Sequence, residues 1–185
     1  MTEKIVEHIA LKKKNFKGEE TEVTIKDLLK YENLKSCNLF HFYITKEDIN
    51  ILNQLPCLQM VKFDMCYFNM ETLQLNETIQ DICFNLCENL KIKHLKNTKA
   101  GEITIIQLKE ANIELNLAEL EYAENLKELA IHHCKVKGLE NILEKAPNLK
   151  RLNLDGSIVE DKSILFELKN KIRITNEEEF YLANA

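Results

Sequence analysis

The chain has 185 residues and is poor in the residue types that mark several common protein classes. It has no tryptophan, two prolines and four glycines, so it offers neither a collagen-like tract nor a flexible glycine-rich linker. Of its 25 basic residues only Arg151 and Arg173 are arginine, and the formal net charge is -5. Because bidentate contacts to phosphate and guanine favour arginine, this balance argues against a general nucleic-acid or anionic-membrane binder.

Long apolar runs are also missing. No stretch approaches the roughly 18 consecutive apolar residues that a membrane span needs. The amino-terminal segment carries charges every few residues, so we expect no secretory signal and an intracellular protein, cytoplasmic or nuclear. In that setting reduced thiols are the default. The six cysteines are Cys37, Cys57, Cys66, Cys83, Cys87 and Cys134.

Catalytic motifs are scarce in the same way. The sequence contains no GxxxxGK[ST], GxSxG, HExxH or GxGxxG motif, and its four glycines are too dispersed to cradle a phosphate group. We therefore expect no enzymatic activity, no catalytic residue and no cofactor. A hydrolase-like or metal-dependent enzyme is the weakest of the alternatives.

An internal repeat organises nearly the whole chain. Its clearest copy starts at Leu126 and has apolar residues at positions 1, 4, 6, 9 and 11. Further copies start at residues 6, 34, 58, 79, 103 and 149. Across all seven copies only Lys14, Asn89 and Ser157 break the apolar pattern. Such regularity predicts one structural unit used repeatedly.

The repeat pattern describes a short strand followed by a turn. Positions 4 and 6 alternate as the buried side chains of a strand do, so positions 3, 5 and 7 fall on the opposite face. Position 9 is a tight inward position. Pro56 and Pro147 each stand two residues before a copy starts, where a helix between copies must stop. One copy cannot bury its apolar side alone, so stacked copies would share one core.

This pattern resembles the leucine-rich repeat superfamily, whose motif LxxLxLxxN/CxL it matches over residues 5–175. The resemblance implies an α/β fold: a right-handed solenoid, or horseshoe, with a concave parallel sheet of about 7–8 strands and an irregular or helical convex side. It also implies three parts: a capping unit with an atypical first repeat at 1–33, leucine-rich repeats at 34–162, and a carboxy-terminal cap and tail at 163–185.

Two local stretches resemble the acidic leucine-rich nuclear phosphoprotein family. They are Gly138–Gly156 and the segment Ser163–Leu168 with the strand that follows it. The sequence has no long acidic tail of the kind that family carries, and Ser157 stands where the family has asparagine. This resemblance implies a nuclear regulator that binds histones or a phosphatase as one alternative function.

Helices are expected between the strands and at the ends. The patterns predict them over residues 24–31, 45–55, 138–146 and 163–168, with a closing strand at 172–174. Thr45 has the residue type that caps a helix amino terminus.

Two groups of cysteine and histidine residues are candidate zinc ligands, because zinc favours tetrahedral sets of these residue types. Cys83 and Cys87 form one group, and the run from His132 to Cys134 forms the other. The repeat places the groups two copies apart, about 10 Å at a strand spacing of ~4.8 Å. They are too distant to share an ion, so we expect core cysteines and no metal site.

The concave face is the candidate binding surface, because neighbouring strands present side chains there in register. Its first half is rich in apolar side chains, which together with a polar rim are typical of a partner site. We expect a non-enzymatic protein–protein interaction module or scaffold, monomeric on its own. The alternative is a component of a ribonucleoprotein particle that contacts nucleic acid through surface lysines. The candidate partner-binding residues are Phe40, His41, Met60, Lys62, Met65, Asp81, Cys83, Leu86, Ile105, Lys109, His132, Arg151 and Asp155.

Overall fold

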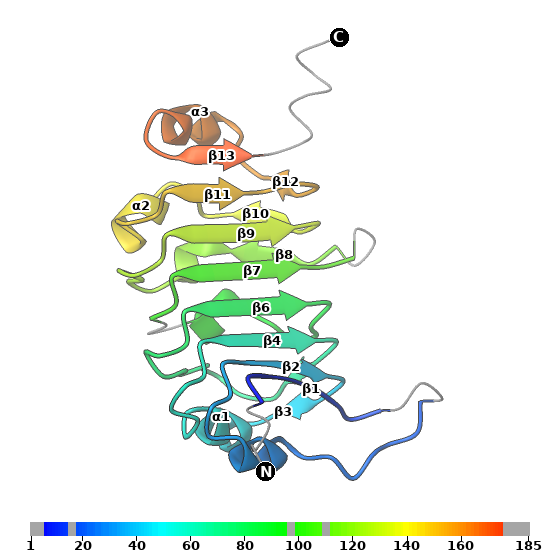
Figure 1. Ribbon diagram of the computed structural model, residues 1–185. Helices are drawn as coiled ribbons and strands as arrows, with labels where there is room; N and C mark the ends of the chain where they lie inside the picture. Colours follow the sequence, from blue (N-terminus) through cyan, green and yellow to red (C-terminus); the bar gives the residue numbers. More distant parts are fainter. Residues whose placement is uncertain (1–5, 15–17, 96–98, 109–111, 176–185) are drawn as a thin grey trace.

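The computed structural model describes residues 6–14, 18–95, 99–108 and 112–175 (Figure 1). Its largest element is an eight-stranded sheet in the order β1-β2-β4-β6-β7-β9-β11-β13. All seven strand pairings are parallel. The strands are β1 (His8–Lys12), β2 (Ser36–Phe40), β4 (Met60–Asp64), β6 (Asp81–Asn85), β7 (Glu102–Ile106), β9 (Glu128–His132), β11 (Arg151–Asn153) and β13 (Arg173–Thr175).

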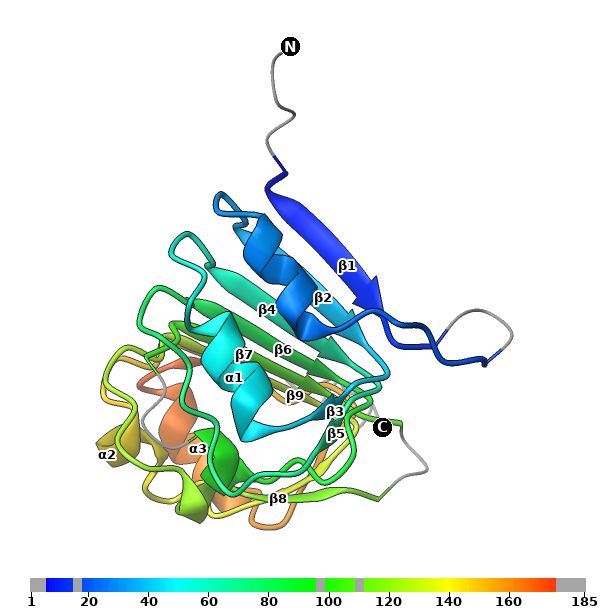
Figure 2. The same ribbon diagram turned by 90° about the horizontal axis from the view of Figure 1, so that it is seen from below.

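Shorter elements cover one side of this sheet. Figures 1 and 2 show the helices α1, α2 and α3 on the same side of the eight strands. The helices are α1 (Lys46–Leu52), α2 (Ile142–Lys145) and α3 (Ser163–Lys169), and the 3₁₀ helices are η1 (Ile25–Lys30), η2 (Ile92–Leu95) and η4 (Leu117–Glu119). Two smaller parallel sheets pair β3 (Tyr43–Ile44) with β5 (Tyr67–Phe68), and β10 (Lys135–Lys137) with β8 (Glu114–Asn116) and β12 (Ile158–Val159). The protein is therefore α/β with a large parallel sheet, as predicted.

The core lies between the large sheet and these shorter elements. Each of β2, β4, β6, β7 and β9 buries its second and fourth residues and leaves the first and third at least partly exposed. Phe63, Phe68 and Phe84 form an aromatic cluster with ring centroids 5.2–5.6 Å apart. The buried second residues stand in one register row: Cys37, Val61, Ile82, Ile103, Leu129 and Leu152.

The inward position 9 is a hydrogen-bonding position as well as a packing position. The Cys66 thiol donates to the Leu39 carbonyl oxygen at 3.2 Å, and the Cys87 thiol donates to the Phe63 carbonyl oxygen at 3.4 Å. At the same position in a later copy, the Ser157 hydroxyl donates to the carbonyl oxygen of Ile131 at 2.9 Å. Because a buried carbonyl needs a donor, a hydroxyl can replace a thiol here, which explains why Ser157 breaks the apolar pattern.

The sequence interpretation is wrong in the fifth copy. Ile103 pairs with Ile82 and Leu129, so it occupies position 4, and the copy starts at Ala100 rather than at residue 103. Consequently Ile105, expected on the exposed face, is completely buried. Leu108, expected in the core, is 57% exposed, although the corrected register puts it at position 9. The run from Ile103 to Ile106 contains only one polar residue, so an apolar count fits either register.

In the fifth copy the residue at position 8, rather than the one at position 9, fills the inward space. Gln107 is buried, and its side-chain amide donates to the carbonyl oxygen of Cys87 at 2.9 Å. Ala111, which the sequence placed at position 9, lies outside the described residues. A polar side chain thus supplies the donor that a thiol or hydroxyl supplies in the neighbouring copies.

Most of the predicted helices are confirmed. Thr45 caps α1: its hydroxyl accepts the backbone N–H of Asp48, and the Asp48 carboxylate accepts the N–H of Thr45. The segment predicted at 24–31 is the 3₁₀ helix η1, and α2 is shorter than the 138–146 predicted. At the end of the stack, α3 is followed by β13, which pairs with β11 through Ile174 and Leu152.

Candidate interaction surface

The face of the eight-stranded sheet opposite the helices, here called the open face, presents three rows of side chains across the strands. The first row is His8, Ser36, Met60, Asp81, Glu102, Glu128, Arg151 and Arg173. The second is Ala10, Asn38, Lys62, Cys83, Thr104, Ala130, Asn153 and Thr175. The third is Lys12, Phe40, Asp64, Asn85, Ile106 and His132.

The thirteen candidate residues fall into four places. The structure brings seven of them onto the open face: Phe40, Met60, Lys62, Asp81, Cys83, His132 and Arg151. Four others directly follow a strand or its turn: His41, Met65, Leu86 and Asp155. Ile105 belongs to the core, and Ile106 takes the place expected for it. Lys109 lies outside the described residues.

A left-handed residue ends several of the strands. His41, Met65, Leu86 and His133 have φ values of 60°, 52°, 52° and 59°. Residues other than glycine seldom adopt such positive φ values. The N–H groups of the first three still donate to the neighbouring strand, at 2.8–3.0 Å. The chain therefore turns sharply at the carboxyl edge of the sheet, so these side chains lie at that edge rather than in the rows.

An apolar diagonal crosses three strands of the open face. It consists of Met60, Cys83 and Ile106, each one strand further on and two residues further along the strand. Met60 is 45% exposed, and the other two are half-buried. Leu86 adjoins the end of the diagonal, because its N–H donates to the Ile106 carbonyl oxygen at 2.8 Å. Diagonal neighbours on a sheet are within reach of long side chains, so these residues can form one patch.

Phe40 stands apart from this diagonal. The ammonium nitrogen of Lys12 lies 5.3 Å from the centre of its ring, a cation–π geometry. In the third row two polar residues, Asp64 and Asn85, separate Phe40 from the end of the diagonal at Ile106. The apolar side chains that the sequence predicts for the first half of this face therefore do not form one patch, because Phe40 is separate from the diagonal.

The polar residues beside the diagonal are bound to one another. Lys62 lies 3.2 Å from a carboxylate oxygen of Asp64, and the amide of Asn85 donates to the other oxygen at 2.8 Å. Asp64 is only 6% exposed, so its charge is held by these two partners within the sheet surface. These contacts fix the polar residues that border the diagonal.

Burial changes the acidity of two open-face groups. It raises the pKa of the Cys83 thiol, and the nearby Lys62 ammonium partly opposes that shift. Burial also raises the pKa of the Asp81 carboxyl, and the negative charge of Glu102 on the next strand adds to it. With Glu128 beyond Glu102, three carboxylates stand in consecutive strands of the first row.

A cleft of about 510 Å³, here called the edge cleft, opens beside the left-handed residues at the amino-terminal end of the sheet. Tyr43 and Tyr67 stack there with ring centroids 4.9 Å apart and planes 9° apart. Lys13 and Lys14 approach from the segment after β1, and Met65 also lines the space. Sequence analysis missed this site because both tyrosines lie at repeat positions that point away from the core and from the sheet rows.

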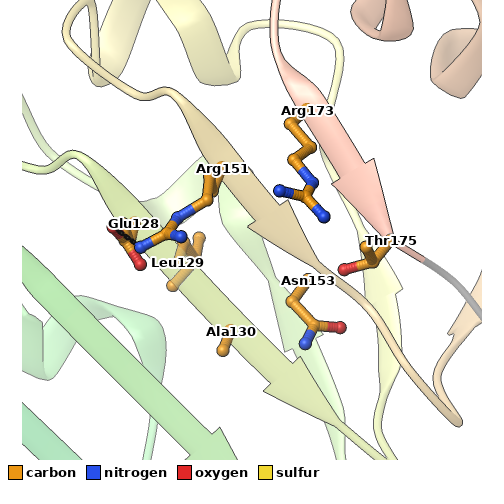
Figure 3. A pocket seen from close by; sticks show the side chains of 7 residues that line it. All are labelled: Glu128, Leu129, Ala130, Arg151, Asn153, Arg173 and Thr175. Carbon is orange, nitrogen blue, oxygen red and sulfur yellow. Dashed lines mark hydrogen bonds and ion pairs between the residues drawn. The ribbon is translucent and has the colours of Figure 1, made fainter.

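A second depression of about 290 Å³ lies at the other end of the open face (Figure 3). Arg151 and Arg173 border it, together with Asn153, Thr175 and Glu128. Arg151 was predicted as a candidate, whereas Arg173 was not, because the closing strand was predicted without assigning its faces. Had the repeat been extended by one copy, residues 173 and 175 would have fallen on the open face.

Four cysteines are buried. Burial raises the pKa of Cys37, Cys87 and Cys134 to about 12 and that of Cys66 to about 11. Cys57 is exposed, and no cysteine forms a disulfide. Within the described ranges, no group of three or more histidine, cysteine, aspartate or glutamate side chains could hold a metal ion.

The comparisons with known proteins give no family. No family model matches the chain, and no solved structure matches it. In the part of the chain that the structure describes, no helix has both the length and the apolar character needed to cross a lipid bilayer. Function must therefore be argued from the surface itself.

Proposed function

We propose that the chain is a leucine-rich-repeat solenoid that works as a non-enzymatic interaction module, binding a protein partner through the open face. The single observation that carries this proposal is the apolar diagonal. Met60, Cys83 and Ile106 occupy rows whose side chains the core does not need. Apolar residues at such positions, bordered by fixed polar groups, are typical of a protein interface.

The fold proposal rests on register. Core residues four and six places into successive copies align along the sheet, with the fifth copy starting at Ala100. Residues 34–162 then form the repeats. Residues 1–33 and 163–185 include the units that cover the two ends, where stacked repeats need capping. β1 supplies an extra parallel strand at one end and β13 at the other.

The test is a double substitution on the diagonal, M60D/I106D. Met60 is exposed and Ile106 is half-buried, so the variant should stay folded with a loss of stability of about 1–2 kcal/mol, mostly from Ile106. Two carboxylates in the centre of an interface should weaken partner binding by at least ~2 kcal/mol. Affinity purification with mass spectrometry compares the proteins captured by the wild type and by the variant.

The matched control is L29D/I158D. It places the same two charges on apolar side chains that are 42% and 53% exposed and lie off the large sheet. The proposal requires that the diagonal variant lose partners that the control retains. If the folded diagonal variant captures every wild-type partner at wild-type level, the open face is not the binding surface.

A second candidate function, a component of a ribonucleoprotein particle, is favoured by the edge cleft. Stacked exposed tyrosines beside lysines are typical of surfaces on which unpaired bases stack. Glu20, Asp48 and Glu88 also line the cleft, which weakens this reading. Binding of a fluorescent oligo-uridine should fall steeply with salt and be lost in Y43A/Y67A if the cleft holds RNA. Equal binding by wild type and variant would exclude it.

A further inference from the structure

The two arginines of this lysine-rich chain stand side by side. Arg151 opens β11 and Arg173 opens β13, and the two residues are register partners on the open face. All the other basic residues are lysine. Since arginine offers a planar fork of five donors and lysine offers a point charge, the only two forks available to the chain are concentrated at one place.

The two guanidinium groups differ in what they already bind. Arg151 makes an ion pair with Glu128 on the preceding strand. The guanidinium of Arg173 makes no hydrogen bond or ion pair with a side chain in the described residues, and the strand lies at the end of the sheet. Two adjacent cations with one bound anion leave a local excess of one positive charge.

The depression supplies further donors around this charge. Ala130, the register partner of Asn153, is a small residue between larger neighbours and lines the hollow. The side-chain oxygen of Asn153 accepts the Asp155 N–H at 3.0 Å, which leaves the amide nitrogen as a donor. Thr175 adds a hydroxyl at the border, and Figure 3 shows these side chains around the same space.

We propose that Arg151, Arg173, Asn153 and Thr175 form a subsite that binds a carboxylate of an acidic segment in the partner protein. Guanidinium forks match a carboxylate in bidentate geometry. One carboxylate neutralises the excess of one positive charge, whereas a phosphate dianion would leave a negative charge beside Glu128 and Glu102. The proposal rests on the proposed function, because it assigns a chemistry to one end of the same open face.

The same row sets the order of charges that such a segment needs. Beyond the arginine pair the first row continues with Glu128, Glu102 and Asp81, one per strand. A segment lying across the strands would therefore place its acidic residue over the arginines and basic residues over Glu102 and Asp81, because Glu128 is already paired with Arg151. This order gives the segment one direction along the sheet.

Because the chain has only two arginines, ligand binding at the subsite can be followed directly by NMR of their side chains. A ¹⁵N-labelled sample of the full chain has only two arginine side chains, so its Nε–Hε region should contain two signals, assigned by R151K and R173K. The full-length protein is titrated with an acetylated tetraglutamate amide peptide, with a matched tetraglutamine peptide and with inorganic phosphate. We expect saturable shifts of both signals with tetraglutamate and none with tetraglutamine.

Charge-matched variants separate the subsite from net charge. R173Q and K171Q each remove one positive charge from the same segment, and Lys171 precedes β13. R173Q should weaken tetraglutamate binding about fivefold or more, and K171Q should leave it within about twofold. Binding to K171Q is followed through the two Nε–Hε signals, and binding to R173Q through the remaining one.

Three results would overturn the proposal: no saturable shift, an equal loss in R173Q and K171Q, or tighter binding of phosphate than of tetraglutamate. Glu177, Glu178 and Glu179 follow β13 in the sequence. Tighter peptide binding in E177Q/E178Q/E179Q would identify them as competitors for the same arginines and would support carboxylate binding. If the titration fails while M60D/I106D still loses its partners, the subsite alone is rejected and the proposed function stands.

Discussion

Two adjacent isoleucines allow a direct test of the register. Ile105 is completely buried in β7, whereas Ile106 lies on the open face and is half-buried. Changing isoleucine to alanine removes three carbon atoms, each worth about 0.8 kcal/mol when fully buried. At Ile105 a residual cavity adds to this loss, so I105A should destabilise the protein by about 3–4 kcal/mol. At Ile106 only part of the side chain is buried and solvent fills the space, so I106A should cost about 1 kcal/mol.

Thermal unfolding and urea unfolding, each followed by circular dichroism, measure both variants under the same conditions. For a protein of this size, I105A should lower the melting temperature by roughly 10 °C and I106A by about 3 °C. Retention of the native spectrum before the transition shows that each variant folds. The register from the sequence interpretation predicts the reverse order, because it places residue 106 in the core. A larger loss in I106A than in I105A would therefore refute the structure's assignment of β7.

The remaining predictions concern thiols and one close contact. Native alkylation at mildly alkaline pH should modify exposed Cys57 first and half-buried Cys83 more slowly, while the buried cysteines react only after unfolding; rapid native labelling of Cys134 would contradict the buried position 9. Gly156 has a φ of 70°, and a Cβ atom there would lie 2.3 Å from His133 Nδ1, so G156A should cost more than about 1 kcal/mol. H133A/G156A should recover part of that loss, and strictly additive losses would show that the contact is unimportant.

The stacking direction and most of the core could be predicted from the sequence. Apolar positions 4 and 6 with one polar residue between them specify a short strand with one buried face. Leu129 with Ile131 and Val61 with Phe63 follow this rule, and both pairs are buried in neighbouring rows of one sheet. The alternation succeeds there because polar residues mark the exposed face unambiguously.

The register prediction failed in the fifth copy because polar residues do not mark the exposed face of its strand. Ile103, Ile105 and Ile106 are equally apolar, so packing in three dimensions selects which of them is buried. Leu108 does not distinguish the registers either, because both assign it an inward position, and the structure exposes it. The burial of Gln107 could not be predicted either. Its side-chain amide is stabilised by a hydrogen bond to the carbonyl oxygen of Cys87, which belongs to another copy.

The sequence predicted which candidate residues lie on the exposed face of the sheet, but it did not predict which of them lie next to one another. Sequence placed Met60, Cys83 and Arg151 correctly on the exposed face, because each stands next to a buried strand position. It could not place Met65 and Leu86, whose left-handed backbone moves them to the edge of the sheet. Hairpins and helices have local signals for such turns in glycine or asparagine, and neither residue type occurs at these two positions.

Asp81 offers a final test of whether the open face is built for folding or for binding. Burial and the neighbouring Glu102 raise its pKa, so the charged form is disfavoured in the folded state. Because the folded-state pKa lies above the unfolded value, the charged carboxylate destabilises the fold at neutral pH, and this effect disappears in acid where the group is protonated. D81N should therefore raise the melting temperature at neutral pH and leave it unchanged in acid.

The Asp81 carboxylate destabilises the free folded protein. Its presence is explained if a basic residue of the partner neutralises its charge. D81N should then weaken partner capture while stabilising the free protein, whereas K127Q, an exposed substitution outside the three rows, should change neither. A neutral-pH loss of stability in D81N would show that the carboxylate makes a favourable contact in the fold. Unchanged capture by a stabilised D81N would remove Asp81, and the acidic stretch of the first row with it, from the proposed interface.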